Sequence, residues 1–160
     1  ETTEQILRKI KRSKTGKLVL NANTAKVLEQ AISELPLDMK EDELQRLEFL
    51  VSKGFPGKSG EQLATVFTNF YHFQRASNIA SDLSISTQNR PNKELNFQQT
   101  VLRQKRYLGK DITQQLFGQQ NTLTKYLYAR RHINENTNLD IEQKQQQLSI
   151  LQDQFKTNAQ

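Results

Sequence analysis

Apolar residues recur three or four positions apart along nearly the whole chain, which is the spacing that places them on one face of an α-helix. The longest such segment covers about residues 59–83, where the spacing is kept by Leu63, Val66, Phe67, Phe70, Phe73 and Ile79 or Ala80. The only stretch that fits a short strand is residues 17–20, which read KLVL. The sequence therefore predicts an all-α protein.

Capping residues, prolines and glycines predict where these helices begin and end. Asn23 or Thr24, and later Asp38, are candidate N-caps, whereas Gly109 and Gly118 are candidate stops. The predicted helices cover about residues 2–13, 24–35, 40–53 and 59–83, then from near Pro91 to 108, 111–117, 121–133 and 140–155.

The distribution of apolar residues predicts two parts joined by a linker. Burying the six large apolar side chains of residues 59–83 stabilises a fold by on the order of 10 kcal/mol at most, and the helices at 24–35 and 40–53 are close enough in sequence to cover them. After residue 92 the apolar stripes become thinner. We predict an N-terminal helical mini-domain with a basic lead segment at 1–85, a linker at 86–92, and an extended, non-globular helical arm at 93–160.

The composition favours a protein that binds a partner through exposed helices. Only 34% of the 160 residues are hydrophobic, and 20 Gln and 12 Asn make the surface rich in amides. The net charge is +6, and it is concentrated near the start, at Arg8, Lys9, Lys11, Arg12, Lys14 and Lys17. Such a segment is typical of a solvated helix face and linker, and the alternative is a basic helical nucleic-acid-binding protein.

Gly57, Lys58 and Ser59 raise the question of a phosphate-binding loop. That motif needs its first glycine five residues before the Gly-Lys-Ser, together with a preceding strand, and Ser52 stands at the glycine position. We interpret the stretch as a turn between two helices, in which Ser59 caps the second helix.

No catalytic, metal-binding or cofactor-binding set is indicated by the remaining residue types. The chain has no Cys, and its two histidines, His72 and His132, fall in separate predicted helices without carboxylates at ligand spacing. We predict that His72 is a partly buried packing residue and that His132 lies at the surface. The sequence thus indicates a protein that is not an enzyme and that uses no cofactor and no metal.

The segment from residue 106 to residue 155 resembles the lipase-specific foldases, a family of periplasmic chaperones. The opening Leu-Phe-Gly at residues 116–118, the Tyr-Leu at 126–127 and the Asn-rich turn at 136–138 carry the resemblance, followed by Leu139, Lys144, Leu148 and Leu151. Nearer the start, TGKLVLN and FTNFYHFQRA resemble the family more loosely. Where the family has Arg-x-x-Phe-Asp-Tyr, residues 25–30 read AKVLEQ, and only Leu28 and Glu29 resemble Phe-Asp.

The resemblance implies a steric foldase that wraps a hydrolase exported by type II secretion, either a lipase or another hydrolase such as a protease. It implies one client per chaperone and no nucleic-acid partner. The residues that it places in contact with the client are Leu28, Glu29, Leu116, Phe117, Tyr126 and Arg130.

The resemblance also implies a location in the periplasm. No window of about 18 apolar residues occurs in the sequence, and the chain starts at Glu1 without Met. We therefore expect any contact with the inner membrane to be made by an anchor upstream of residue 1.

Overall fold

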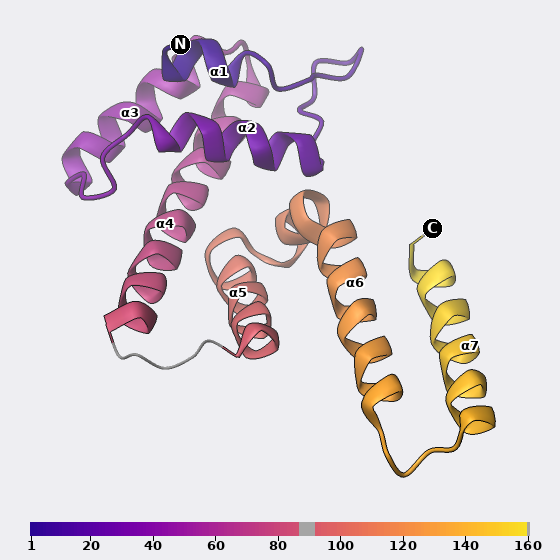
Figure 1. Ribbon diagram of the computed structural model, residues 1–160. Coiled ribbons are helices and arrows are strands. Elements are labelled where there is room, and N and C mark those ends of the chain that lie inside the picture. The colour runs from indigo at the N-terminus through magenta and orange to yellow at the C-terminus, as the bar shows by residue number, and fades with distance from the viewer. Residues whose placement is uncertain (87–91, 160) are drawn as a thin grey trace. The chain divides into compact units, whose positions relative to one another are not determined.

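The computed structural model describes residues 1–86 and 92–159 (Figure 1). Within these residues the chain forms helices and no strand, which confirms the all-α prediction. The helices are α1 (Thr3–Leu7), α2 (Ala22–Ser33), α3 (Glu41–Gly54), α4 (Lys58–Ser86), α5 (Lys93–Leu108), α6 (Lys110–Glu135) and α7 (Ile141–Asn158).

The contacts within the chain divide it into two compact units. Unit 1 comprises Glu1–Leu116, and unit 2 comprises Phe117–Gln160. Helix α5 packs along α4 in unit 1, whereas α6 begins in unit 1 and continues into unit 2. Most of the predicted linker, residues 87–91, lies outside the described residues, and the predicted domain limits stay a prediction.

The core of unit 1 forms where α2 and α3 pack against the first half of α4, as expected from the apolar spacing. The predicted stripe of α4 is buried from Leu63 to Phe73. Its next member, Ile79, is 53% exposed, so the stripe leaves the core in the second half of the helix. In α3 the apolar spacing overestimates burial, because Leu50 is 57% exposed while Val51 beside it is buried.

Tyr71 ties the loop between α2 and α3 to this core. Its side chain is fully buried, and its hydroxyl donates to the carbonyl of Pro36 at 2.7 Å and accepts from the amide of Met39 at 3.1 Å. His72 next to it is half-buried, and its ring lies edge-on to Tyr71 with 6.0 Å between the centroids. The predicted packing role of His72 is therefore confirmed.

The first predicted helix is shorter than expected. α1 ends at Leu7, although Ile6, Leu7 and Ile10 are all buried as the spacing predicted. The residues that follow include Arg8 and, three and four positions after it, Lys11 and Arg12. Like charges at this spacing repel one another in a helix, so a continuation of α1 is destabilised. The predicted strand at residues 17–20 is also reduced, because it contributes only an isolated antiparallel bridge between Arg12 and Leu18.

Two helix caps differ from the predicted ones. Asn21, rather than Asn23 or Thr24, caps α2, because its side-chain oxygen accepts from the amides of both of those residues. Lys40, rather than Asp38, occupies the N-cap position of α3, and its amide donates to the Glu43 carboxylate at 2.9 Å.

The predicted break at Gly118 is absent, and α6 is a single helix from Lys110 to Glu135. A glycine inside a helix costs only about 1 kcal/mol relative to alanine, which the helix-favouring residues on either side offset. Gly109, by contrast, ends α5 as predicted, because its φ of 80° is a conformation that side-chain-bearing residues rarely adopt.

The Gly57-Lys58-Ser59 stretch is a turn between α3 and α4, as predicted. Gly57 has a φ of 66°, and α4 starts at Lys58. The prediction that Ser59 caps this helix is wrong, because Ser59 lies inside the first turn of α4 and its hydroxyl donates to the carbonyl of Pro56. Gly60 then passes so close to the chain before it that a Cβ there would overlap the carbonyl oxygens of Ser52 and Phe55.

Candidate functional site

The second unit contains a helical hairpin that has almost no core of its own. From Phe117 onward α6 runs antiparallel to α7 (Figure 1), and α7 has no buried residue. The rings of Tyr126 and Phe155 stack between the two helices with 4.5 Å between their centroids. Helices of this length depend on the burial of an apolar face for most of their stability. The hairpin, defined here as residues 117–159, therefore presents a surface suited to a partner.

The turn of the hairpin is well specified by the sequence. Asp140 caps α7 by accepting from the amide of Gln143 at 2.8 Å, and Asn136 accepts from the amide of Asn138. Lys144, in the second turn of α7, donates to the carbonyl of Asn134 at 3.0 Å, near the end of α6. These bonds fix the direction in which α7 leaves the turn.

Apolar side chains remain uncovered on both helices of the hairpin. Leu123 and Leu127 lie one turn apart on α6 and are 39% and 51% exposed. On α7, Ile141 is 77% exposed and Ile150 is 58% exposed. Exposed apolar groups of this size in neighbouring positions mark interaction surfaces when they gather on one element.

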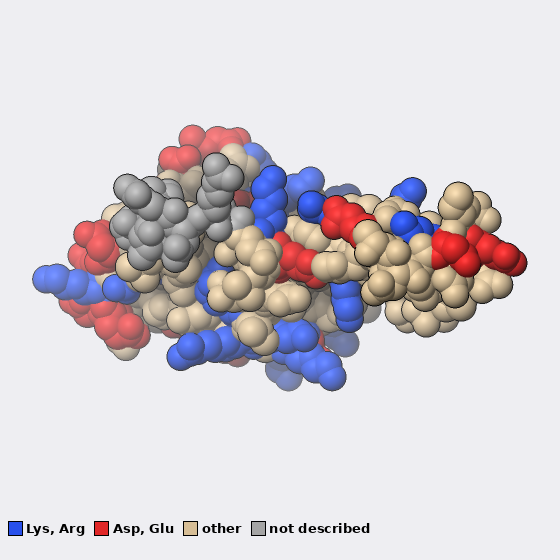
Figure 2. Space-filling view, turned by 60° about the horizontal axis from the view of Figure 1, so that its bottom comes forward, with Lys and Arg blue, Asp and Glu red and all other residues tan. Residues whose placement is uncertain are grey.

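Uncharged side chains dominate the hairpin surface. In Figure 2 the right-hand part of the view, which the hairpin occupies, is mostly tan, with acidic and basic side chains in places. The long Gln-rich run of α7, residues 145–147, is exposed. Amide groups offer hydrogen-bond donors and acceptors without a formal charge, so a partner would meet apolar contacts bordered by neutral polar groups.

The structure places the six predicted contact residues in different environments. Leu28 is 0% exposed and Leu116 is 1% exposed, both within unit 1. Direct contact with a client through these two side chains would require the core of this chain to open.

The other four predicted residues are accessible to a partner. Glu29 and Arg130 are exposed, and Phe117 and Tyr126 are half-buried. Tyr126 and Arg130 lie one turn apart on α6, on the same side as Leu123 and Leu127. The structure thus brings two of the six together on the hairpin, while Glu29 lies on α2.

Sequence reasoning did not single out Leu123 and Leu127 as exposed apolar residues of the hairpin. The signal was present, because Leu123, Leu127 and Arg130 follow the i, i+4, i+7 spacing of one helix face. The predicted helix at 121–133 held all of them, but apolar residues at that spacing are usually core residues, and only the structure shows that they are uncovered.

Within the described residues, no group of three or more His, Asp or Glu side chains gathers as a metal site would require. His132 is exposed on α6, as predicted for it. None of the described helices is long and apolar enough to cross a membrane.

Comparisons with known proteins identify the family. Searches among curated proteins and among solved structures gave no match. The family model of the proteobacterial lipase chaperone protein matches residues 66–160, which is more than half of the chain. The match includes the complete hairpin and the second half of α4. The resemblance found in the sequence is therefore confirmed, and the chain belongs to the proteobacterial lipase chaperone family.

Proposed function

We propose that this chain assists the folding of a secreted lipase by binding it along the α6–α7 hairpin. Family membership implies a foldase role with a lipase as the client, and this is a family of chaperones, which fits a protein without catalytic activity. The observation that carries the proposed surface is that α7 has no buried residue while Leu123, Leu127 and Ile141 remain exposed. These side chains gain their burial from the client.

The proposed mechanism is steric. A foldase accelerates folding when it binds the folding barrier of the client more tightly than the trapped intermediate, and each 1.4 kcal/mol of that difference gives about a tenfold rate increase. A hairpin that wraps its client one to one, together with unit 1, buries more than about 2,000 Å². Glu29, Phe117, Tyr126 and Arg130 make direct contacts, and Leu28 and Leu116 hold their helices in place.

The proposal places the chain in the periplasm, because folding of a secreted lipase takes place there before type II secretion. An anchor in the inner membrane is supplied by sequence upstream of residue 1. The alternative client is a secreted protease. It is suggested by residues 25–30, which read AKVLEQ where the resemblance predicts Arg-x-x-Phe-Asp-Tyr.

A refolding experiment tests the proposed surface. A denatured lipase, and in parallel a denatured protease, both encoded beside this chain, are diluted into buffer with or without the chain, and recovered activity is measured. We expect the chain to raise lipase recovery, and the double variant L123Q/L127Q to lower the refolding rate roughly tenfold, because two central apolar contacts are lost.

The matched control is L95Q/L102Q. It makes the same chemical change at two exposed leucines of α5, which are 48% and 67% exposed. Equal losses in the two double variants, or no loss in L123Q/L127Q, would reject the hairpin as the binding surface. If only the protease recovers activity, the client is a protease and not a lipase, and the hairpin remains the proposed binding surface.

A further inference from the structure

A basic surface cavity lies in unit 1, between the segment after α1 and the turn that precedes α4. Its volume is about 620 Å³. Arg12 and Lys17 line it from the first segment, and Lys58 lines it from the start of α4. No carboxylate is among the described residues that line it. A cavity with three cations and no acid favours an anionic ligand.

The segment that carries Arg12 and Lys17 is an ordered loop. The amide of Ser13 donates to the carbonyl of Lys17 at 2.8 Å, and the amide of Gly16 donates to the carbonyl of Ser13 at 2.9 Å. Gly16 has a φ of 78°, which a residue with a side chain would adopt only with strain. The backbone that carries these two cations is therefore held in a defined conformation.

Arg12 connects this loop to the turn on the other side of the cavity. Its guanidinium carbon lies 4.9 Å from the ring centroid of Phe55, and Phe55 is only 5% exposed. A cation over an aromatic ring is attracted by the electrons of the ring, which limits where the side chain moves. Lys58 lies in the first turn of α4, where the aligned backbone dipoles add to its positive potential.

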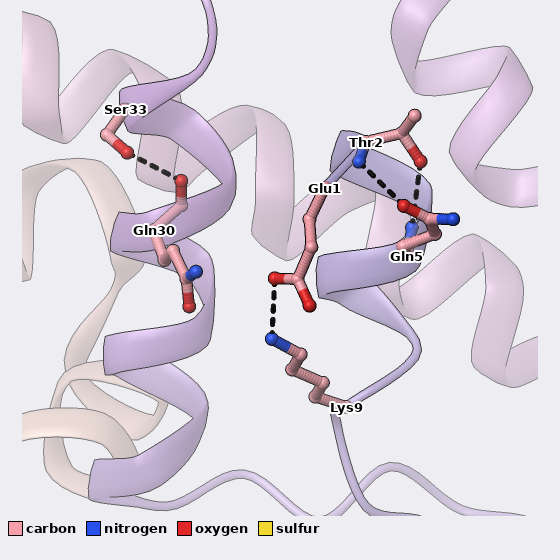
Figure 3. Close-up of polar contacts among 6 residues, drawn as sticks. All are labelled: Glu1, Thr2, Gln5, Lys9, Gln30 and Ser33. Atoms are coloured by element: carbon pink, nitrogen blue, oxygen red, sulfur yellow. Dashed lines mark hydrogen bonds and ion pairs between the residues drawn. The ribbon is translucent and has the colours of Figure 1, made fainter.

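Two cations just before this loop are paired with carboxylates, whereas, in the part of the chain that the structure describes, the three cations that line the cavity are not. Lys9 donates to the carboxylate of Glu1 at 2.8 Å (Figure 3), and Arg8 pairs with Glu4 at 2.7 Å. The hydrogen bond and the charge of Lys9 lower the pKa of the Glu1 carboxyl. Among the ion pairs of the described residues, none involves Arg12, Lys17 or Lys58.

We propose that this cavity binds a phosphate group, which carries up to two negative charges and several acceptor oxygens. Arg suits such a group because its planar guanidinium donates two parallel hydrogen bonds, and Lys adds a compact charge. This assignment does not revive a phosphate-binding loop of the nucleotide-hydrolysing type, because neither its first glycine nor its strand is present. The source of the phosphate is either a soluble phosphate compound or the headgroup of an anionic phospholipid.

The test uses the whole 160-residue chain in about 0.1 M salt, where exposed charges more than about 10 Å apart are largely screened. Inorganic phosphate is titrated and amide chemical shifts are followed by NMR. We expect saturable shifts in residues that line the cavity. The K17Q/K58Q variant weakens binding roughly tenfold, since each exposed ion pair contributes about two- to fivefold.

The matched control is K14Q/K26Q, which removes the same charge from two exposed lysines outside the cavity and is expected to leave binding unchanged. Absence of saturable shifts, or equal weakening by both variants, overturns the proposal. Tight binding of a random DNA duplex that both variants weaken equally also overturns it, because that shows a general basic surface.

A second arm identifies the source of the phosphate. Vesicles of phosphatidylglycerol and of phosphatidylcholine are sedimented with the wild-type chain and the two variants. Binding to phosphatidylglycerol vesicles that K17Q/K58Q lowers and K14Q/K26Q keeps supports a lipid headgroup in the cavity. Phosphate binding without vesicle binding supports a soluble phosphate compound.

Discussion

At the scale of single residues, the backbone at Gly60 passes very close to the turn between α3 and α4. A side chain at Gly60 would overlap the carbonyl oxygens of Ser52 and Phe55, which belong to the backbone and cannot move aside easily. We predict that Gly60→Ala lowers the free energy of unfolding by about 1–3 kcal/mol, the usual cost of overpacking. Urea denaturation followed by circular dichroism measures it.

Gly54→Ala is the control for this prediction. A Cβ at Gly54 meets nothing within 4 Å, and the residue is the last of α3. Because alanine favours helix over glycine by about 1 kcal/mol, we expect this variant to be as stable as the wild type or slightly more stable. If Gly60→Ala were as well tolerated as Gly54→Ala, the close approach would not exist in solution.

Single residues also show how far sequence reasoning reaches. The burial of Leu63 and Phe67 was predictable, because helical spacing over a long segment leaves one face for the core. The exposure of Leu50 was not predictable. The spacing places Leu50 on a wide apolar face, but it does not show which residues at the edge of that face pack against another helix. Likewise, nothing in the sequence distinguished the buried Leu116 from the accessible Phe117 beside it.

At the scale of elements, the stack of Tyr126 on Phe155 joins α6 to α7 in the hairpin. An aromatic pair contributes about 0.5–1.5 kcal/mol beyond the area that it buries. We predict that Tyr126→Ala raises the population of open hairpin roughly two- to tenfold. Spin labels at the exposed positions Lys125 and Gln154 report this opening as a broader distance distribution.

Leu127→Ala is the comparison for the hairpin prediction. Leu127 is 51% exposed and adjacent to Tyr126, so its truncation should leave the distance distribution unchanged. The melting temperature of unit 1 should stay the same in both variants. An unchanged distribution in Tyr126→Ala would mean that the stack does not hold the two helices together.

Helix boundaries were the least predictable feature at this scale. Gly109 and Gly118 are the same residue type in similar surroundings in the sequence, yet one ends a helix and the other lies inside α6. The difference is set by backbone conformation: Gly109 has a positive φ, whereas the helix continues through Gly118. Glycine permits both outcomes at low cost, so only the packing of the flanking residues decides between them.

At the scale of the whole molecule, the two units are expected to differ in how they unfold. Unit 1 has a buried core around Phe67, Phe70 and Tyr71, while α7 has no buried residue. We predict that a fragment of residues 1–120 unfolds cooperatively on heating. A fragment of residues 117–160 should lose helix gradually, because helices in proteins take most of their stability from tertiary packing and α7 has no buried residue.

Circular dichroism of the two fragments, alone and with a denatured lipase, measures this difference. Addition of the lipase should increase the helix content of the 117–160 fragment and leave that of the 1–120 fragment unchanged. A sharp melting transition in the isolated 117–160 fragment would show that the hairpin has a stable core without a partner. This experiment does not test the predicted extended arrangement of residues 93–160, which stays a prediction.

The lack of buried residues in α7 has a consequence for turnover. A segment that loses little packing when it opens exchanges its amide hydrogens quickly. When such a segment binds a partner, the free-energy cost of ordering it reduces the affinity. A lower affinity shortens the lifetime of each complex. We predict that the hairpin therefore binds its client only while the client folds and then releases it, so that one chaperone molecule acts on many clients.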